Sequence, residues 1–497
     1  MTLNDFDEQS SLILAAEDYP PETFSDYHRF TAYDKRFISK LAAHGPVLLR
    51  GGRGSGKSAL MIEASRQLAP YKKDASAFGV YISLRHLELL RKEGRAYEKV
   101  LCRLLIDRVR ECLGEMSVSF DPEPSVSSVQ TELSKLTIKL KSRLVLFFDD
   151  AAHIGREAPL EAFFDIFRTL SSSTVSCKAA IYPGVTKFGT RFDVYNDATV
   201  LEISRNEELA GYDELFAEII RLRFPQFFSG NMPVTDLDFI KFAGFLGRAV
   251  LGNMRAFIFA CNALSERCAD NAKIGVSNLG AVLLSLCGNY YWPLLEELKP
   301  KLGKHELMIE PAINIAEIMF GICGKRERRS AIIHRNIINK LAKPFEMLEY
   351  AGFISRRDVS RAMKSGGRGS RFVLSLCVLL ENTPGTRLTN NLFQQWSTEH
   401  DEPAEFHRGS EINTIELPEL PDSADLSVIN KSVRELAKSK IYPYGLTEQK
   451  IQLLIEAGIE TIGDLISAND KQLLSLKSVG SQTLERFRSV AAQAIWM

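Results

Sequence analysis

Eight consecutive residues constrain this chain more than any other feature. Gly51-Gly52-Arg53-Gly54-Ser55-Gly56-Lys57-Ser58 fits the pattern G-x-x-x-x-G-K-[ST] without a mismatch. An apolar run at residues 47–50 precedes it, and residues 59–68 carry a helical pattern. Glycine permits the tight curl that the backbone needs between such a strand and helix. The octapeptide therefore predicts a strand–loop–helix unit within an α/β core.

The same loop, a P-loop, predicts a site for a phosphorylated ligand. Its backbone N–H groups would point at a β-phosphate at the start of the helix. Lys57 would place its charge on the β- and γ-oxygens, Ser58 would ligate Mg²⁺, and Ala59 closes the nucleotide-binding segment. An ordinary glycine-rich turn is the alternative, which the strand before and the helix after disfavour. ATP is the expected nucleotide, because the sequence has no [NT]KxD run to select guanine.

A second half of this site is expected at the end of another apolar run. Residues 144–148 are apolar and are followed by Asp149 and Asp150. Asp149 is predicted to hold hydrated Mg²⁺ together with Ser58, and Asp150 to orient or deprotonate the attacking water. A plain strand end is the alternative. The P-loop upstream favours the metal-side interpretation.

The pattern around these motifs predicts an α/β domain followed by a helical one. Between residues 28 and 205 we expect strands near 47–50, 79–84, 143–148, 178–182 and 199–203, with helices between them. Strands that are almost wholly apolar indicate a parallel sheet covered on both faces. Residues 206–295 have apolar residues at helical spacing and predict a helical lid.

The charges are unevenly distributed although their sum is zero. Residues 1–27 hold seven acids and no Lys or Arg, which predicts an acidic tail. Residues 324–371 hold thirteen Lys or Arg against four acids, within a predicted basic module at 300–382. Residues 399–425 hold nine acids against Arg408 alone, and with their prolines they predict an acidic linker at 383–432.

The cysteines and the apolar runs predict a cytoplasmic protein. The eight cysteines form no CxxC pair, so Cys261 and Cys268, seven residues apart, are expected in the core rather than in a metal site. The N-terminus lacks a basic leader, and no apolar run approaches about 18 residues. A reducing compartment and no membrane partner are therefore expected.

The basic module is predicted to be a winged helix. We expect helices at 309–322, 330–341 and 344–351, then a hairpin whose second strand covers 371–380. The cations suited to DNA phosphates would be Lys340 and Lys343 near the recognition helix and, on the wing, Arg356, Arg357, Arg361, Lys364, Arg368 and Arg371. Alternatively, these charges solvate a protein-interaction module.

The last 65 residues resemble the C-terminal domain of the RNA polymerase alpha subunit. The matching segments are Leu446-Thr447, residues 457–465, Leu473-Leu474 and residues 479–484. The resemblance implies an all-α pair of helix-hairpin-helix units in residues 433–497, which grip phosphates in the minor groove. Gln449 and Gln452 replace the arginine and asparagine of the relatives, whereas Lys450, Lys477 and the Gly480 amide remain. Weak DNA contact and protein docking both stay open.

Residues 30–382 resemble the initiator-type AAA+ ATPases of the origin-recognition clade, or their STAND relatives. Gly252-Asn253-Met254-Arg255 is similar to their G-N-P-R segment, which implies that Arg255 reaches the γ-phosphate from the lid. Arg191 lies where such proteins carry the arginine finger that completes a neighbour's site. Two departures are a second acid that is Asp150 rather than Glu, and a sensor residue that could only be Thr186.

These patterns lead to two functional hypotheses. The first is a DNA-binding AAA+/STAND-type ATPase, slow in hydrolysis, that self-associates and whose ATP state controls assembly on double-stranded DNA. The second is an ATP-dependent signalling switch that recruits a protein effector, as in bacterial immunity. The two differ in whether the basic module binds DNA. A helicase motor is disfavoured, because no helicase motif accompanies the nucleotide-site motifs.

Overall fold

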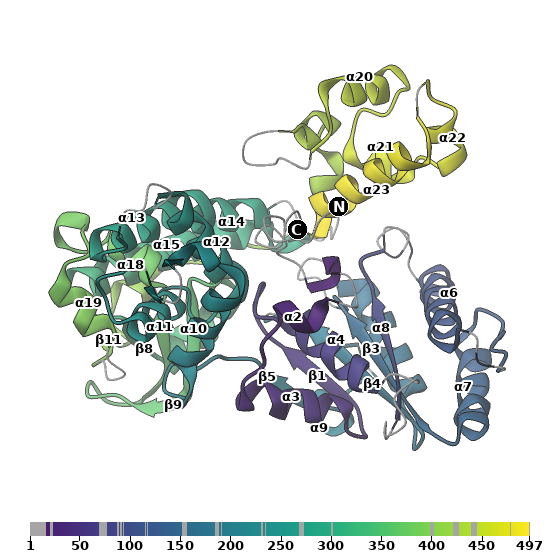
Figure 1. Ribbon diagram of the computed structural model, residues 1–497, viewed down its shortest axis with the longest axis horizontal. Coiled ribbons are helices and arrows are strands. Elements are labelled where there is room, and N and C mark those ends of the chain that lie inside the picture. Colours follow the sequence, from purple (N-terminus) through teal and green to yellow (C-terminus); the bar gives the residue numbers. More distant parts are fainter. Residues whose placement is uncertain are drawn as a thin grey trace.

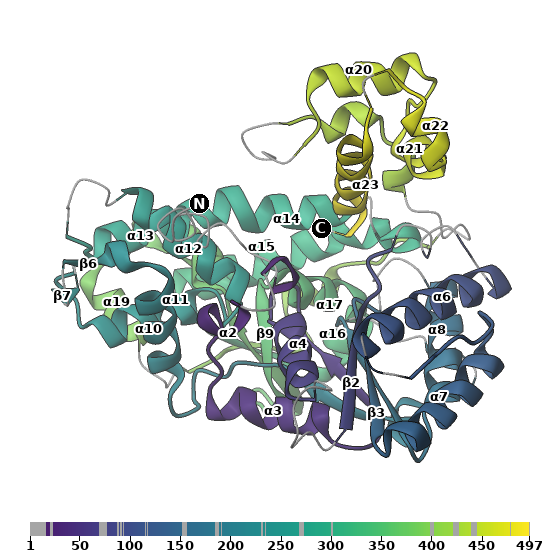
Figure 2. The same cartoon turned by 45° about the vertical axis from the view of Figure 1, so that its right-hand side comes forward.

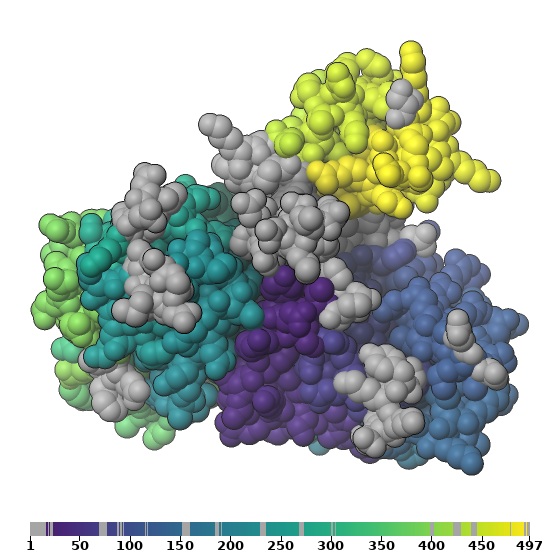
Figure 3. Space-filling model, in the orientation of Figure 1, coloured from purple at the N-terminus to yellow at the C-terminus, as the bar shows by residue number. Residues whose placement is uncertain are grey.

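The computed structural model describes residues 16–19, 23–68, 77–86, 89, 92, 94–114, 116, 118–151, 157–183, 188–189, 191–229, 232–233, 235–267, 273–299, 302–397, 402–420, 427–438, 445–477 and 479–496. The chain forms an α/β layer, a second body of helices with a small sheet, and a C-terminal module (Figure 1). In the space-filling view the C-terminal module is a separate lobe above the other two (Figure 3).

A five-stranded parallel sheet forms the centre of the α/β layer. Its order is β2-β3-β4-β1-β5. The strands are β1 (Val47–Arg50), β2 (Ala77–Ser83), β3 (Arg143–Asp149), β4 (Val175–Ile181) and β5 (Thr199–Glu202). Because all five run in the same direction, their carboxyl ends lie along one edge.

Both faces of this sheet are covered, as the apolar strands predicted. Leu144 and Leu146 of β3 pack against α6 (Gly94–Leu113), α7 (Val126–Leu140) and α8 (Glu157–Leu170). Val145 and Phe147 point the other way, against α3 (Ala32–Ala42) and α4 (Lys57–Gln67). This alternation with period two places consecutive side chains on opposite faces. Short helices η1 (Ala16–Asp18), α2 (Phe24–Tyr27) and α9 (Val194–Asp197) complete the layer.

The helical region and the basic module share one hydrophobic core, which extends from Tyr212 to Ile412. The helical region contains α10 (Tyr212–Arg223), η2 (Pro225–Phe227), β6 (Phe228–Ser229), β7 (Met232–Pro233), α11 (Phe239–Ala249), α12 (Met254–Arg267), α13 (Val276–Leu286), the π-helix η3 (Cys287–Tyr291) and α14 (Trp292–Leu298). The basic module contains η5 (Gly303–Met308), α15 (Ile309–Lys325), β8 (Ser330–His334), α16 (Arg335–Lys340), α17 (Ala342–Ala351), β9 (Ile354–Ala362), β10 (Arg368–Leu374) and α18 (Leu376–Glu381). The two regions therefore form one body.

Two predictions for the basic module were wrong in part. Residues 330–341 are not one helix, because β8 occupies 330–334 and pairs antiparallel with β10. The run Ser-Ala-Ile-Ile-His is fully buried, and a short apolar run of this kind does not distinguish strand from helix. The strand expected at 371–380 ends at Leu374, and α18 follows.

The segment 383–432 is not simply a linker. It contains η6 (Pro384–Thr386), α19 (Asn390–Ser397), β11 (Ala404–Phe406) and η7 (Glu411–Thr414). β11 pairs parallel with β8 and extends the small sheet to the order β11-β8-β10-β9. Phe393 and Trp396 are buried in the shared core. Apolar residues spaced between the acids therefore anchor the first half of this segment.

The C-terminal module has a hydrophobic core of its own. Its elements are η8 (Ser427–Asn430), η9 (Val433–Leu436), α20 (Glu448–Glu456), α21 (Ile462–Ser467), α22 (Asp470–Leu474) and α23 (Ser481–Trp496), and the turned view shows them above both other parts (Figure 2). Gln449, Gln452, Lys477 and Gly480 are exposed there, and Lys450 is partly exposed.

Two further expectations concern the cysteines and the membrane. Cys261 is buried in the shared core, whereas Cys268 lies outside the described residues. The seven described cysteines form no disulfide with one another. In the described part of the chain one helical stretch, His305–Lys325, is long and apolar enough to cross a membrane. Much of it is buried in the shared core as η5 and α15.

Candidate nucleotide site

The polar residues of the candidate site gather at the carboxyl edge of the parallel sheet. The P-loop follows β1, Arg85 comes two residues after β2, and Asp149 ends β3. Tyr182 directly follows β4, and Arg205 comes three residues after β5. Ligands of open α/β sheets bind at this edge. Arg53, Lys57, Arg85, Tyr182 and Arg205 line one pocket here.

The P-loop has the backbone that its glycines predict. Gly54 and Gly56 have φ angles of 76° and 90°, in the left-handed region that favours glycine. α4 begins at Lys57, so its first N–H groups face the pocket. The ammonium of Lys57 donates to the carbonyls of Gly51 and Gly52 at 2.8 and 3.0 Å. Burial lowers the pKa of Lys57 to about 8, although Asp150 and Asp149 oppose this effect.

The two predicted acids lie beside the P-loop serine. The side chain of Ser58 is hydrogen-bonded to Asp149, and Tyr81 donates to Asp149 Oδ2 at 2.6 Å. Burial, followed by the charges of Asp150 and Glu17, raises the pKa of Asp149 to about 7. Glu17, Asp149 and Asp150 each offer an oxygen within 4.8 Å of the others. Hard carboxylate and hydroxyl oxygens are the ligands that Mg²⁺ prefers, so these residues fit a magnesium site.

Asp150 is held on both sides. Its φ of 52° lies in the left-handed region, which is uncommon for a residue other than glycine. Arg85 Nε approaches Asp150 Oδ2 at 2.6 Å, and the Tyr182 hydroxyl donates to Oδ1 at 2.9 Å. The carboxylate therefore has a fixed direction at the edge of the pocket.

The helical region contributes to the same pocket through the start of α12. Asn253 Nδ2 donates to the Arg53 carbonyl at 2.6 Å, and Met254 N donates to the Gly54 carbonyl at 3.0 Å. Arg255 lines the pocket, and burial followed by the charge of Arg53 lowers its pKa. Its buried Nε has no hydrogen-bond partner among the described residues. A polyphosphate would supply the anion that this desolvated arginine lacks.

Apolar side chains line the other end of the pocket. They come from the N-terminal segment and the helical region, and they are Tyr19, Tyr27, Phe30, Ile219, Met254 and Ile258. A purine ring could be received there, because ligand pockets combine apolar walls with a few polar groups.

The basic module contacts the P-loop directly. Arg53 N donates to the Tyr350 carbonyl at 3.2 Å. A Cβ built on Gly52 would lie 3.0 Å from the Glu349 carbonyl, so any larger residue would crowd the end of α17. Tyr350 also packs against Tyr182, with ring centres 5.0 Å apart. The end of α17 thus lies against the nucleotide site.

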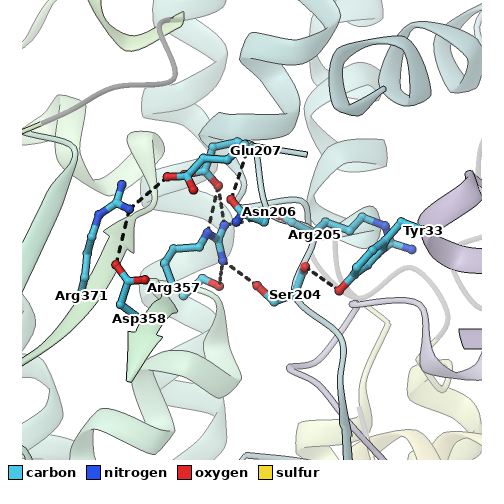
Figure 4. A network of polar contacts seen from close by, with 10 residues as sticks. Tyr33, Ser204, Arg205, Asn206, Glu207, Arg357, Asp358 and Arg371 are labelled. Carbon is cyan, nitrogen blue, oxygen red and sulfur yellow. Dashed lines mark hydrogen bonds and ion pairs between the residues drawn. The ribbon is translucent and has the colours of Figure 1, made fainter. Parts of the chain in front are cut away.

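A polar network connects this site to β9 (Figure 4). Arg205 donates to the Ser55 carbonyl and to Asp34. Two residues further on, Glu207 accepts from Arg357 Nη2 at 2.7 Å, and both side chains are at most 3% exposed. Arg357 also donates to Ser204 Oγ at 2.8 Å. Burial opposes the ionisation of Glu207, but the charge of Arg357, the hydrogen bonds that Glu207 accepts and the charge of Arg329 together outweigh it and lower the pKa.

The structure corrects the prediction that all wing cations face a DNA phosphate. Arg357 is buried against Glu207, and Arg371, 8% exposed, contacts Glu208 at 3.0 Å. Arg356 pairs with Glu349 at 3.0 Å, and Lys364 pairs with Glu402. Elsewhere Lys340 donates to the Asn413 carbonyl at 2.7 Å, and Lys343 pairs with Glu346 at 3.1 Å. Arg361 and Arg368 stay exposed. Glu207, Glu208 and Glu402, which neutralise three of these cations, come from distant segments, whereas Glu349 lies seven residues before Arg356.

Other predicted residues are not brought to the pocket. Arg191 is exposed and is not among the described residues that line it; its carbonyl accepts from Arg168. Thr186 lies outside the described residues.

The sequence motifs did not indicate Glu17, Arg85, Tyr182 and Arg205 as residues of the site. A signal existed for the last three, because each lies within three residues of the carboxyl end of a strand predicted to be parallel. Glu17 had no such signal. It comes from the N-terminal acidic segment, which no motif connects with the P-loop.

Comparisons with known proteins add distant likenesses only. No family model matches the chain, and no curated protein matches it. Among solved structures it is similar to the Aeropyrum pernix Orc1 protein in complex with DNA, at 13% identity and a TM-score of 0.34, over 79% of this chain and 96% of that one. It is also similar to Drosophila ORC bound to DNA, at 9% identity and a TM-score of 0.33, over 78% and 90%. We therefore rest the functional assignment on the contacts within this chain.

Proposed function

We propose that this protein is a DNA-binding AAA+/STAND-type ATPase whose ATP state controls its assembly on double-stranded DNA. The observation that carries the proposal is a pocket that the P-loop and Arg255 line, with Asp149 beside Ser58 of the P-loop and the basic module in contact with Arg53. The same loop that would bind the phosphates is therefore in direct contact with the basic module.

The residues of the pocket have roles that follow from their chemistry. Lys57 and Arg255 would neutralise the phosphates, while Ser58 and Asp149 would hold Mg²⁺, which supplies charge stabilisation when bound. Asp150 would orient a water and accept its proton as the water oxygen bonds to the γ-phosphorus. The bond to the bridging oxygen then breaks, and ADP and phosphate leave. Asp150 has a shorter side chain than Glu, which is consistent with slow turnover.

We interpret residues 206–295 as the lid and α15 to β10 as a winged helix. The order helix, strand, two helices and hairpin supports this interpretation. The lid contacts the P-loop through Asn253 and Met254, and the winged helix does so through Tyr350. A phosphate bound in the P-loop would therefore affect the contacts that the P-loop makes with the lid and with the winged helix.

DNA would be contacted by the exposed cations that remain. Arg361 and Arg368 on the hairpin belong to this group, as do Lys477 and the partly exposed Lys450 of the C-terminal module. We interpret α20 with α21 and α22 with α23 as helix-hairpin-helix units, whose turn amides suit phosphates. These contacts carry no sequence information by themselves.

Self-association would complete the site through Arg191. The residue is exposed and absent from its own pocket, as an arginine that acts on a neighbour must be. An Arg191→Ala protein should bind ATP normally and hydrolyse it about 1,000-fold more slowly. Mixing it with a Lys57→Ala protein, which keeps Arg191, should restore activity. Turnover equal to wild type at every protein concentration would show that Arg191 is not a finger.

A signalling switch that recruits a protein effector is the second candidate. The neutralised wing favours it, because Arg357 and Arg371 are held by acids of the same chain. ATP turnover measured with and without duplex DNA decides between the two. Stimulation by DNA supports the first function. No DNA binding by the intact protein, with or without ATP, would leave only the second, and no nucleotide binding would exclude both.

A further inference from the structure

The topology of the sheet places one residue between the two halves of the nucleotide site. β4 lies between β3 and β1 in the sheet. In register, Ile181 pairs with Arg50 and Ala179 with Phe148. Tyr182, the next residue, therefore emerges between the P-loop and the pair Asp149-Asp150.

The Tyr182 side chain contacts three elements at once. The ammonium of Lys57 lies 3.9 Å from the centre of its ring, a cation–π distance. Its hydroxyl donates to Asp150 Oδ1 at 2.9 Å. On the side of the basic module, its ring meets that of Tyr350 at 5.0 Å and an interplanar angle of 63°. The side chain is thus in contact with the lysine, the second acid and α17.

The hydroxyl has a specific task, because Asp150 cannot orient itself. A carboxylate on a short side chain that must act on a water needs a fixed direction. Arg85 fixes one oxygen of Asp150, and Tyr182 fixes the other. Removal of the hydroxyl would leave Asp150 pivoting on the Arg85 contact.

Because the Tyr182 ring packs against Tyr350, the orientation of the Asp150 carboxylate depends on the position of the basic module. The same residue accepts a hydrogen bond from Arg53 of the P-loop through its carbonyl. A basic module that moves away would take both contacts with it. The Tyr182 ring would then lose the surface that holds it over Lys57.

We propose that Tyr182 is a positioning residue through which the basic module controls the nucleotide site. Its hydroxyl aims Asp150, and Tyr350 keeps that hydroxyl in place. This inference rests on the proposed function, since it assigns a role in the hydrolysis of ATP. The basic module would therefore control the rate of ATP hydrolysis and leave the nucleotide affinity unchanged.

The test uses four single variants and one double variant of the full chain. Tyr182→Phe keeps the ring and removes the hydroxyl, and Tyr350→Leu removes the neighbouring ring without touching Asp150. Tyr350→Phe is the matched control, because it keeps that ring, and Lys57→Ala reports on the nucleotide site itself. Affinity for a fluorescent ADP, single-turnover hydrolysis of ATP and thermal unfolding are measured for each.

Tyr182→Phe should lower turnover about tenfold while nucleotide affinity stays within about twofold. Tyr350→Phe should resemble wild type, and Tyr350→Leu should lower turnover about threefold to tenfold. The double variant Tyr182→Phe/Tyr350→Leu should be no slower than Tyr182→Phe, because the two residues act through one contact. If Tyr182 and Tyr350 had only structural roles, the substitutions would lower the unfolding temperature instead. The losses of turnover in the two single variants would then multiply in the double variant.

Two results would overturn the inference alone. One is turnover of Tyr182→Phe within twofold of wild type, and the other is a double variant whose loss equals the product of the single losses. In both, wild type still binds nucleotide and Lys57→Ala does not. If wild type binds nucleotide no better than Lys57→Ala, the proposed function fails, and this inference fails with it.

Discussion

The nucleotide pocket and the wing of the basic module are both rich in cations, yet they use them in opposite ways. In the pocket, Lys57 and Arg255 are desolvated and their pKa values are lowered by burial. On the wing, the side chains of Arg357 and Arg371 are also buried, but each has a carboxylate within 3.0 Å. Among the described residues, Lys57 and Arg255 form no ion pair, whereas Arg357 and Arg371 each form at least one.

The difference distinguishes a ligand-binding site from a structural joint, by which we mean a buried ion pair that holds two segments of the chain together. A buried cation without an ion-pair partner costs stability and is retained where a ligand supplies the missing charge. A buried cation with its partner holds two segments in place, and loss of either member is costly. Counting Lys and Arg along the sequence treats both sets alike. Only the positions of the acids distinguish them.

Lys57→Ala should produce the largest effect and should confine it to ligand binding. We expect nucleotide affinity to fall at least about 100-fold, because the phosphate charge loses its closest cation. The unfolding temperature should not fall, since the fold already lowers the pKa of Lys57 to about 8 and so disfavours its charged form. Calorimetric titration with ADP and thermal unfolding measure the two quantities.

The matched control is Lys135→Ala, which removes an exposed lysine of α7. It should change neither quantity. If folded Lys57→Ala protein binds nucleotide at wild-type affinity, Lys57 does not bind the phosphates, and the proposed difference between the pocket and the wing is wrong.

How far the sequence predicts this comparison depends on the range of the contacts. Lys57, Ser58 and Asp149 were predictable, because the motif and the strand that ends in Asp149 are local patterns, and the structure brings Ser58 and Asp149 together. The parallel sheet followed from its apolar strands. The partners of Arg357 and Arg371 were not predictable, since Glu207 and Glu208 lie about 150 residues earlier in the chain. Nothing local indicates such a pair.

Glu207→Ala should have the next largest effect and should act on stability. It leaves Arg357 buried without its carboxylate, which costs about 3 kcal/mol and several degrees of unfolding temperature. The control is Glu402→Ala, whose partner Lys364 is exposed, and it should leave the unfolding temperature unchanged. Equal results for the two variants would show that the buried pair is no joint. A gain in duplex affinity for Glu207→Ala alone would show that the joint restrains the wing.

Asp149→Asn sharpens the pocket side through its pH dependence. The folded pKa of Asp149, about 7, lies above its ordinary value of 3.8, so the fold holds more protons than the unfolded chain between these values. Stability of the nucleotide-free protein therefore falls as pH rises from about 4 to 7. The Asn variant lacks this loss and should be more stable than wild type at pH 8, by about 4 kcal/mol for a pKa difference of about three, and equal to it near pH 4.

Addition of Mg²⁺ and ADP should reverse that order at pH 8, because a cation beside Asp149 stabilises its charged form. Thermal unfolding across this pH range, with and without the ligands, is the measurement. A wild-type protein that is more stable than Asp149→Asn without ligand at pH 8 would contradict the raised pKa.

The smallest effect is expected where the wing still has exposed cations, and it tests whether they bind DNA. Arg361→Ser with Arg368→Ser removes two charges whose loss leaves no buried acid unpaired, so stability should not change. Duplex affinity should fall several-fold, and the slope of log affinity against log salt should become shallower by about 2, one released counterion per lost phosphate contact. The control Lys135→Ser with Lys139→Ser removes the same charge from α7, away from the wing, and should leave the slope unchanged.

Deletion of residues 433–497 should cost less affinity than the wing variant, because the C-terminal module has Gln449 in place of the arginine of its relatives. If that deletion abolishes binding while the wing variant keeps the wild-type slope, the DNA contacts belong to the C-terminal module, and the wing serves only as a joint.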